Sequence, residues 1–421
     1  MQIETEQKIK SFSKEWWEYF IDYTGNMTVP SVVKNTFNND VGILRESIFE
    51  MLQNLKKDKS LIPWRVWVEG ELDKGLKDRI IKDPVKSEDD FLDWEKRHFG
   101  NKKYGIILNT GQRYSEKGRD VISEYFKPFL KDNTPFGGIN FSIFIGNYGW
   151  TPIGIHEDHT GSFVMHFHLG PGSKTMYMWD RANYKESLEG GENNDNPEKY
   201  LPFADYKCDF TEGDVFFMPW NYYHIGRSDQ TSLGLTVWFN YTTVDGLLNG
   251  VWESGLKEVN GENLNDELLV SNVKDVGSID DIDITLSKLD EDKLDETLKE
   301  FIYQELDDYS GALKSSDWYD SGDIKDANHA IEINEDMYLR INKSSIHYRQ
   351  DGDSIKLFHR GDKVSFHNHD DIIKLVSELN NGKEVQVKKL LSGLFQDWPD
   401  GIGVRLLEIL LENSFLQIIN V

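Results

Sequence analysis

Two stretches decide the fold that this sequence predicts. The first is Thr151–Asp180, TPIGIHEDHTGSFVMHFHLGPGSKTMYMWD, and the second is Gly213–Arg227, GDVFFMPWNYYHIGR. Both are short runs of β-branched and aromatic residues bounded by Gly, Pro or Asn, which is typical of strands joined by tight turns. The runs NFSIFIGNY, from Asn140, and SLGLTVWFNYTTV, from Ser232, extend the pattern on either side. The pattern predicts a mainly β core, a sandwich or barrel, and not alternating βαβ units.

The regions around these strands divide the chain into four expected parts. The apolar spacing of residues 1–130 predicts a mostly helical region. This region is expected to cover a barrel formed by residues 131–250. One of its helices is predicted to be broken by Pro128. Residues 251–326 are acidic but keep a helical apolar stripe, which favours a packing or dimerisation helix. Residues 327–421 mix short strands and helices in the manner of an α/β winged-helix-like module.

The composition limits the classes of partner. The chain has 47 Lys+Arg against 73 Asp+Glu and a formal charge of −26, which would repel a phosphate backbone, so no nucleic-acid partner is expected. Cys208 is the single cysteine, which excludes an intrachain disulfide and a thiolate zinc cluster. Charges occupy the place of a signal peptide's apolar run, and no later stretch is apolar over about 18 residues. We therefore expect a cytoplasmic protein without a membrane partner.

A histidine and an acidic residue lie two positions apart in the first stretch. On a strand such residues point the same way, so His156 and Asp158 can face one ion while Glu157 points away. His224 follows the turn after Pro219 and can supply a third ligand from a remote strand. Two imidazoles and one carboxylate form the facial arrangement that leaves positions open for substrate and oxygen on Fe(II). The alternative is that these are hydrogen-bonded core or surface side chains.

A lysine opens the next predicted strand. Lys174, Met176 and Met178 share one face of KTMYMW, and an ammonium that points into an apolar barrel requires an anionic partner. A dicarboxylate co-substrate that chelates the metal at one end and pairs with Lys174 at the other would be such a partner. Alternatively, Lys174 is solvated at the mouth of its strand. If the preceding turn shifts the register, Arg227 or Arg181 is the next candidate clamp.

Other polar side chains on these strands are candidates for the neighbourhood of the site. His166 and His168 share the parity of Val164. They are expected either to line the cavity, where they would support the ligands or the co-substrate, or to be hydrogen-bonded core histidines. An HxH pair also fits the first cupin motif, which would give a three-histidine site. His159 is expected at the surface or rim. Candidate walls of the co-substrate pocket, each of which also fits ordinary core packing, are Asn140, Tyr148, Trp238 and Asn240.

These residues resemble a known family. The HED triplet with the strand after it, Lys174 and His224 are similar to the motifs of Jumonji C and cupin-like Fe(II)- and 2-oxoglutarate-dependent oxygenases. That family includes the asparaginyl hydroxylase that inhibits hypoxia-inducible factor and the bacterial ribosomal-protein hydroxylases. The segment from Gly213 through Pro219 to His224 also matches the second cupin motif, GX5PXGX2H, with Asn221 in place of its Gly.

The resemblance covers roughly residues 135–245 in its motifs and carries expectations about structure and activity. It implies a double-stranded β-helix, iron at His156, Asp158 and His224, and Lys174 on the distal carboxylate of 2-oxoglutarate. In ribosomal oxygenases a helical dimerisation region and a winged-helix domain follow the barrel, so a homodimer is also implied. The expected activity is hydroxylation of a C–H bond with O2, in a peptide or protein side chain. The alternatives are a small-molecule or amino-acid hydroxylase, a cupin isomerase or dioxygenase that does not use 2-oxoglutarate, and a binding protein with a vestigial barrel.

Overall fold

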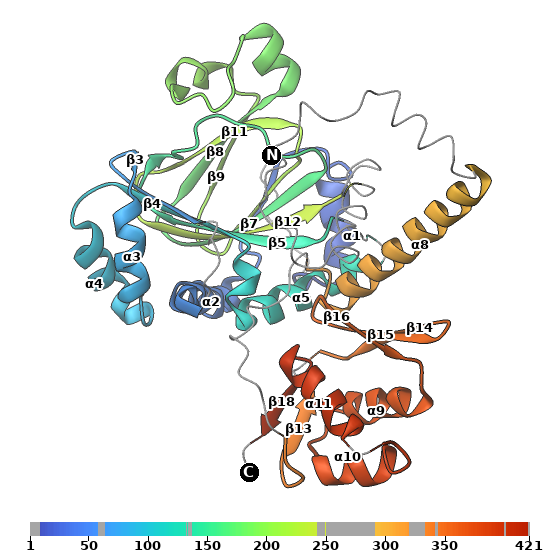
Figure 1. Cartoon of the computed structure of the whole chain (residues 1–421). Helices are drawn as coiled ribbons and strands as arrows, with labels where there is room; N and C mark the ends of the chain where they lie inside the picture. Colours follow the sequence, from blue (N-terminus) through green and yellow to red (C-terminus); the bar gives the residue numbers. More distant parts are fainter. Residues whose placement is uncertain are drawn as a thin grey trace, which may run out of the picture.

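The computed structural model describes residues 9–57, 64–131, 133, 137–241, 249, 291–319, 333–341, 344–399 and 401–419; in the helix that begins at Glu291, side chains are described from Ile302 onward. Two β-sheets form the centre, helices cover the outside of the larger sheet, and a smaller α/β module follows (Figure 1). No described helix is long and apolar enough to cross a membrane. The mainly β core predicted from the strand pattern is confirmed.

Both central sheets are antiparallel, with the strand orders β1-β10-β7-β12-β5-β4-β2-β3 and β6-β11-β8-β9. The larger sheet consists of β1 (Ser31–Val33), β2 (Trp64–Val68), β3 (Glu71–Leu72), β4 (Tyr104–Asn109), β5 (Ile139–Gly146), β7 (Ser162–Pro171), β10 (Val215–Met218) and β12 (Ser232–Asn240). The smaller sheet consists of β6 (Gly149–Trp150), β8 (Lys174–Asp180), β9 (Tyr206–Phe210) and β11 (Tyr222–Ser228). Each deciding stretch therefore gives one strand to each sheet, β7 and β8 from the first and β10 and β11 from the second.

Alternate residues along the strands of the larger sheet face either the helix-covered core or a cavity. On β7, Met165 and Phe167 join the core beneath the helices, whereas Val164 and His166 line a cavity on the opposite face. On β12, the same alternation places Leu235 in the helix-covered core. Because side chains alternate across a strand, one set of residues builds the stable core and the other builds the cavity.

The helical cover consists of α1 (Lys14–Tyr23), α2 (Val41–Asn54), α3 (Lys74–Lys82), α4 (Glu88–Phe99) and α5 (Glu116–Leu130). Aromatic side chains join these helices to each other and to the sheet. Trp17 of α1 stacks on Phe129 of α5 with ring centroids 4.5 Å apart, and Phe126 lies 4.5 Å from Phe239 of β12. Such pairs contribute beyond their buried area, so the predicted N-terminal cover is a packed layer on the sheet.

One local prediction in this region is wrong, and one strand was not predicted. The helix α5 is not broken at Pro128 but continues to Leu130, because the missing N–H falls in the last turn and the buried side chains of Phe129 and Leu130 hold that turn against the core. Within the region predicted as mostly helical, Ser31–Val33 forms a strand that pairs with β10. A strand of three residues has too little periodicity to be recognised without its partner.

The C-terminal part begins with α8 (Glu291–Ser315), which includes the apolar stripe predicted in the acidic region. The module after it contains two three-stranded sheets, β17-β13-β18 and β14-β15-β16, and three helices with a core of their own. Its elements are β13 (Tyr338–Ile341), β14 (His347–Asp351), β15 (Ser354–His359), β16 (Asp362–His367), α9 (Asp370–Asn380), β17 (Val385–Gln386), α10 (Val387–Leu394), α11 (Ile402–Glu412) and β18 (Leu416–Ile419).

Several finer assignments stay predictions. These are the double-stranded β-helix, the winged-helix-like module, the homodimer and the four domain boundaries. Residues 250–290 and 320–332, on which part of the dimerisation prediction rests, lie outside the described residues. The described end of α8 is tied to the central sheets, since the segment after it pairs Tyr319 with Ile139 of β5 and the Tyr319 hydroxyl donates to the Arg119 carbonyl at 3.0 Å.

Candidate metal and co-substrate site

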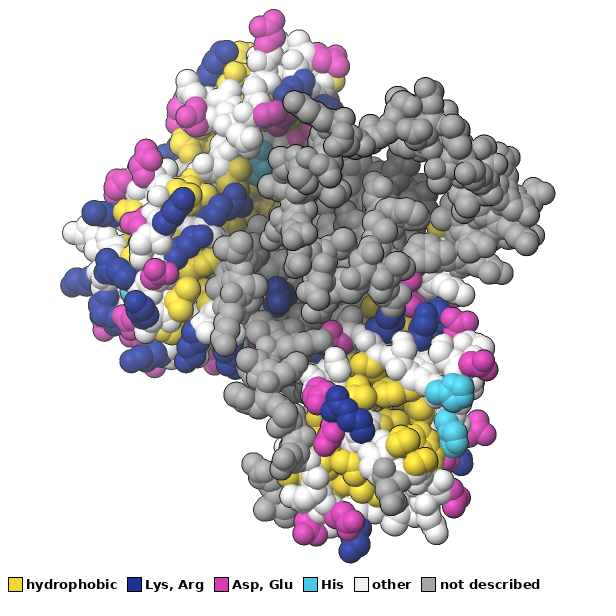
Figure 2. Space-filling view, viewed as in Figure 1, with side chains coloured by type: hydrophobic (Ala, Val, Ile, Leu, Met, Phe, Trp, Pro, Cys, Tyr) yellow, Lys and Arg dark blue, Asp and Glu magenta, His cyan; other side chains and the backbone are white. Residues whose placement is uncertain are grey.

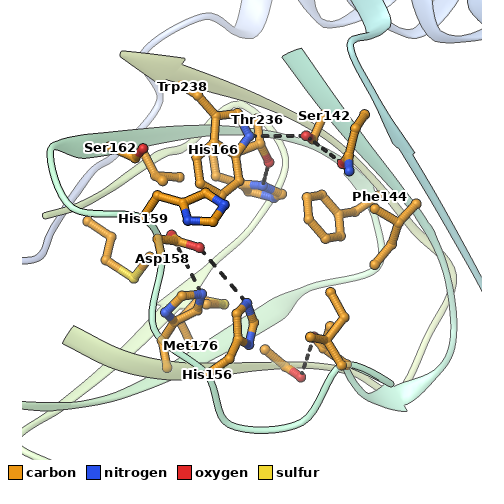
Figure 3. A pocket seen from close by; sticks show the side chains of 18 of the residues that line it. Ser142, Phe144, His156, Asp158, His159, Ser162, His166, Met176, Thr236 and Trp238 are labelled. Atoms are coloured by element: carbon orange, nitrogen blue, oxygen red, sulfur yellow. Dashed lines mark hydrogen bonds and ion pairs between the residues drawn. The ribbon is translucent and has the colours of Figure 1, made fainter. Parts of the chain in front are cut away.

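Three side chains converge in the cavity between the two sheets (Figure 3). Nε2 of His156 lies 4.0 Å from Oδ1 of Asp158, and Nε2 of His224 lies 3.9 Å from its Oδ2. The ligand atoms of all three lie within 4.8 Å of one another. These separations are too long for direct hydrogen bonds, and they leave room for one ion between an imidazole pair and a carboxylate. The structure therefore brings together the three residues that the sequence singled out.

Backbone pairing positions the two histidines. His156 and His224 form an isolated antiparallel bridge, in which their amides donate to each other's carbonyls at 3.2 and 2.8 Å. Nδ1 of His156 lies 2.9 Å from the Gly154 carbonyl, and Nδ1 of His224 lies 3.2 Å from the Tyr222 carbonyl. Because a carbonyl only accepts, each Nδ1 carries the proton and each Nε2 presents its lone pair to the site.

The strand expected to carry His156 and Asp158 is in fact a looser segment. Ile155 pairs with Asn194 in a second isolated bridge, and residues 157–159 have no regular secondary structure. The segment is also held by Glu157, which accepts hydrogen bonds at 2.7 and 2.9 Å from Arg181. Contacts with the 181–200 region thus replace the strand ladder that the sequence predicted.

Burial controls the charges of the site. It lowers the pKa values of His156 and His224 to about 4 each, and the charge of Arg65 contributes to the shift at His156. Burial also raises the pKa of Asp158 to about 6. Near neutral pH both imidazoles are neutral and the carboxylate is ionised, which is the state that binds a metal ion. Oδ2 of Asp158 is buried and accepts no hydrogen bond, so the donor set fits a divalent cation.

The cavity has a volume of about 370 Å³ and contains Lys174 from the opposite sheet. The lysine side chain is 6% exposed, and its Nζ lies 4.8 Å from the ring centroid of Phe144 and 5.9 Å from that of Tyr148. Within the described part of the chain, no carboxylate forms an ion pair with it. The turn before β8 therefore does not rotate Lys174 outward, and a buried cation faces the cavity without an anion.

The two alternative clamps point elsewhere. Arg227 pairs with Asp229 at 2.9 Å and lies over the Trp150 ring at 4.9 Å, and Arg181 is occupied by Glu157. Neither lines the cavity, where the cations among the described residues are Lys174 and Arg65. Arg65 lies on β2 and was not among the site residues predicted from the sequence. Only its pairing with β4 shows which face of that strand the residue occupies.

The predicted cavity walls are mostly in place. Asn140, Trp238 and Asn240 line the cavity. The indole of Trp238 donates to the Ser142 hydroxyl at 3.1 Å, and Oδ1 of Asn240 accepts from the Ser162 hydroxyl at 2.9 Å. These side chains are thus fixed by hydrogen bonds, while their roles toward a co-substrate stay predictions.

Tyr148 differs from the other predicted wall residues. It lies beside Lys174 but is not among the residues that line the cavity. Its hydroxyl is buried and has no hydrogen-bond partner. Tyr148 is therefore a neighbour of the lysine, and its role toward a co-substrate stays a prediction.

The three other histidines near the site, His166, His168 and His159, occupy different positions. His166 lines the cavity, with Nδ1 2.8 Å from the Thr236 hydroxyl and Nε2 buried without a partner; burial holds its pKa well below the usual range. His168 does not line the cavity, because Nε2 lies 2.6 Å from the Gly172 carbonyl. Neither belongs to the group of converging ligand atoms, so the described residues do not form a three-histidine site. His159 is exposed at the cavity rim, as predicted.

Known structures share this architecture. An X-ray structure of Escherichia coli YcfD aligns with a TM-score of 0.50 and 16% identity, over 96% of this chain and 98% of that chain. A structure named as the ribosomal oxygenase YcfD with cobalt and succinic acid aligns with a TM-score of 0.47 and 16% identity over 95% and 98%. The chain shares the fold of YcfD.

A third structure, YcfD with cobalt and 2-oxoglutarate, aligns with a TM-score of 0.47 and 15% identity over 95% of this chain and 98% of that chain. No protein-family model and no curated protein matches the chain. At this level of identity the likeness shows the fold alone, and the chemistry has to be argued from the side chains described above.

Proposed function

We propose that this chain is an Fe(II)- and 2-oxoglutarate-dependent oxygenase that hydroxylates a C–H bond of a peptide or protein side chain. One observation carries the proposal. A cavity holds a two-histidine, one-carboxylate triad and, from the opposite sheet, the buried cation Lys174, which no described carboxylate neutralises. A dianion that binds the metal at one end and the ammonium at the other would satisfy both features.

Each side chain then has a defined task. His156, Asp158 and His224 would hold the metal and leave its other positions open. Lys174 would pair with the distal carboxylate of 2-oxoglutarate. The net reaction converts the C–H bond, O2 and 2-oxoglutarate into the hydroxylated product, succinate and CO2, and the bound metal supplies the oxygen chemistry.

Apolar residues on the same walls would exclude water from beside the metal. Val164, Met176 and Phe216 line the cavity and are buried. A dry wall strengthens the attraction between Lys174 and a carboxylate, because the local dielectric constant is lower than in water. A protein substrate is supported by the fold shared with YcfD, which is named a ribosomal oxygenase.

An anaerobic titration tests the proposal. Full-length protein loaded with Fe(II) should develop the visible charge-transfer band of the iron chelate when 2-oxoglutarate is added, and O2 should then release succinate. The double variant His156→Ala/Asp158→Ala should give neither signal. Arg405→Ala is a suitable control, because Arg405 lies in the C-terminal module and pairs there with Glu412.

The outcomes separate the alternatives. A protein that binds Fe(II) but gives no band would be a cupin isomerase or a dioxygenase that does not use 2-oxoglutarate. A protein that binds no Fe(II) would contradict the metal site itself. A band followed by a product 16 Da heavier in a free amino acid, and in no peptide, would support the small-molecule hydroxylase instead.

A further inference from the structure

A second cation faces the cavity, and the proposed reaction does not use it. Arg65 of β2 pairs in register with Ile107 of β4, which pairs with Phe144 of β5. All three line the cavity, so they form one row across the inner face of the larger sheet. Lys174 projects from the smaller sheet and approaches Phe144 at the other end of this row.

The charge of Arg65 is not balanced inside the cavity. Among the described residues no carboxylate forms an ion pair with it, and its guanidinium lies 5.4 Å from the Trp67 ring centroid on the same face of β2. The acidic residues that line the cavity are Glu157 and Asp158. Arg181 already pairs with Glu157, and Asp158 belongs to the triad.

Further basic residues continue outward from Arg65. Nζ of Lys77 lies 5.8 Å from the ring centroid of Trp64, the residue before Arg65. Burial lowers the pKa of Lys77, and the charges of Arg65 and Lys74 lower it further. Figure 2 shows Lys and Arg side chains gathered over the part of the surface that carries β3, β4 and α3 in Figure 1. On a chain with a formal charge of −26, this basic strip is a local exception.

We propose that Arg65 binds a carboxylate of the substrate, and that Lys74 and Lys77 attract further acidic groups, so that the preferred substrate is an acidic peptide segment. The proposal rests on the proposed function, because it assigns the substrate of that same site. An arginine offers a planar pair of donors that matches a carboxylate, and the Trp67 ring limits its movement. A half-buried cation at the wall selects for the charge of the substrate, and the exposed Lys74 and half-buried Lys77 increase the rate of encounter.

Three pools of peptides of equal length test this specificity. The acidic pool is rich in Asp and Glu, the neutral pool in Asn and Gln, and the basic pool in Lys and Arg. The holoenzyme with Fe(II), 2-oxoglutarate and O2 is assayed for succinate release above the peptide-free level and for peptides 16 Da heavier. We expect the acidic pool to stimulate roughly tenfold more than the neutral pool at low salt, with a smaller preference at high salt.

Charge reversal provides the matched comparison. Arg65→Glu should remove the preference for the acidic pool and raise the response to the basic pool, and Lys77→Glu should weaken the acidic response to a smaller extent. Arg405→Glu makes the same change of charge on the C-terminal module and should retain the wild-type preference. Free aspartate and glutamate are assayed in parallel, and stimulation by them would identify a small carboxylic acid as the source of the same recognised group.

The outcomes keep the two proposals distinct. A wild-type enzyme that forms the iron chelate band and responds most to the basic or neutral pool would overturn the acidic substrate and leave the oxygenase intact. An RNA oligonucleotide that inhibits the acidic-pool reaction more strongly than an acidic peptide of equal charge would also overturn it. Absence of the band would contradict the oxygenase before specificity is considered.

Discussion

The two faces of the larger sheet are built from the same strands and serve opposite purposes. On β10, Phe217 faces the helices in a core of apolar side chains, and its neighbour Phe216 faces the cavity. On β12, Val237 packs in the core and Thr236 holds His166 on the other face. The helix-covered face buries mainly apolar side chains, whereas the cavity face also carries polar atoms that have no partner among the described residues.

This difference has an energetic meaning. An aromatic residue on the covered face contributes roughly 1.5–3 kcal/mol by burial, and an unsatisfied buried polar atom costs about 1–3 kcal/mol. Nε2 of His166 and Oδ2 of Asp158 are such atoms. A fold that keeps them gives up stability on one face of the sheet, which is reasonable if ligands satisfy them. Substitutions on the two faces should therefore have different effects.

The largest expected effect is on stability, at the adjacent phenylalanines of β10. Phe217→Ala should lower the free energy of unfolding by about 3–5 kcal/mol, because it leaves a void among Phe20, Phe163 and the sheet. Phe216→Ala should cost less, because it enlarges a cavity that already exists. Chemical denaturation of the metal-free proteins measures both, and equal losses would contradict the distinction between the faces.

Removing a ligand should act on metal binding instead. His224→Ala is expected to weaken the binding of Co(II) or Fe(II) roughly 100-fold or more, a larger loss than an outer residue gives. His168→Ala is the control, since His168 is also a buried histidine but bonds to Gly172 outside the cavity. Metal content after dialysis measures the effect. Retention of metal by His224→Ala, or its loss from His168→Ala, would place the ion elsewhere.

Substitution of the buried lysine tests how the distal carboxylate of 2-oxoglutarate is bound. Lys174→Ala should raise the 2-oxoglutarate concentration needed for half-maximal turnover by roughly 100-fold, because the distal carboxylate loses its cation in a dry site. Arg227→Ala should leave that concentration unchanged, since Arg227 pairs with Asp229 away from the cavity. If Arg227→Ala raised this concentration strongly and Lys174→Ala did not, Arg227 and not Lys174 would be the residue that binds the distal carboxylate.

The smallest expected effect is a change in stability when the position of the His166 ring is disturbed. A Cβ on Gly234 would lie 2.6 Å from Nε2 of His166, so Gly234→Ala should displace the ring from Thr236 and cost about 1–3 kcal/mol. Gly393→Ala in α10 has open space around its Cβ and should stabilise the protein by about 0.5–1 kcal/mol through helix propensity. Thermal unfolding compares the two, and the same sign for both would show that His166 is not held in this position.

The features that the sequence could predict are those with local signals. Strand alternation identified β7 and β12, and the histidine–acid triplet with a distant histidine after a turn identified the triad. Arg65 had no such signal, because its face depends on pairing with β4, about forty residues later in the chain. The same limit applies to β1, which becomes a strand only beside β10. The sequence also left open whether His168 faces the cavity or the core, since the Gly172 carbonyl that binds it is presented by a turn.

The segment that carries two of the three proposed metal ligands is held by fewer backbone hydrogen bonds than the strands around it. Thr151–His159 is fastened by the bridges of Ile155 to Asn194 and of His156 to His224, without the continuous ladder that stiffens β7. Such a segment opens at a lower free energy than the sheet it lies on. Its amides at Ile155 and His156 should thus exchange hydrogen faster than those of β7 in the empty protein, and slow when the metal is bound. The exchange rate of two backbone amides would then report the loading of the site without any knowledge of the substrate.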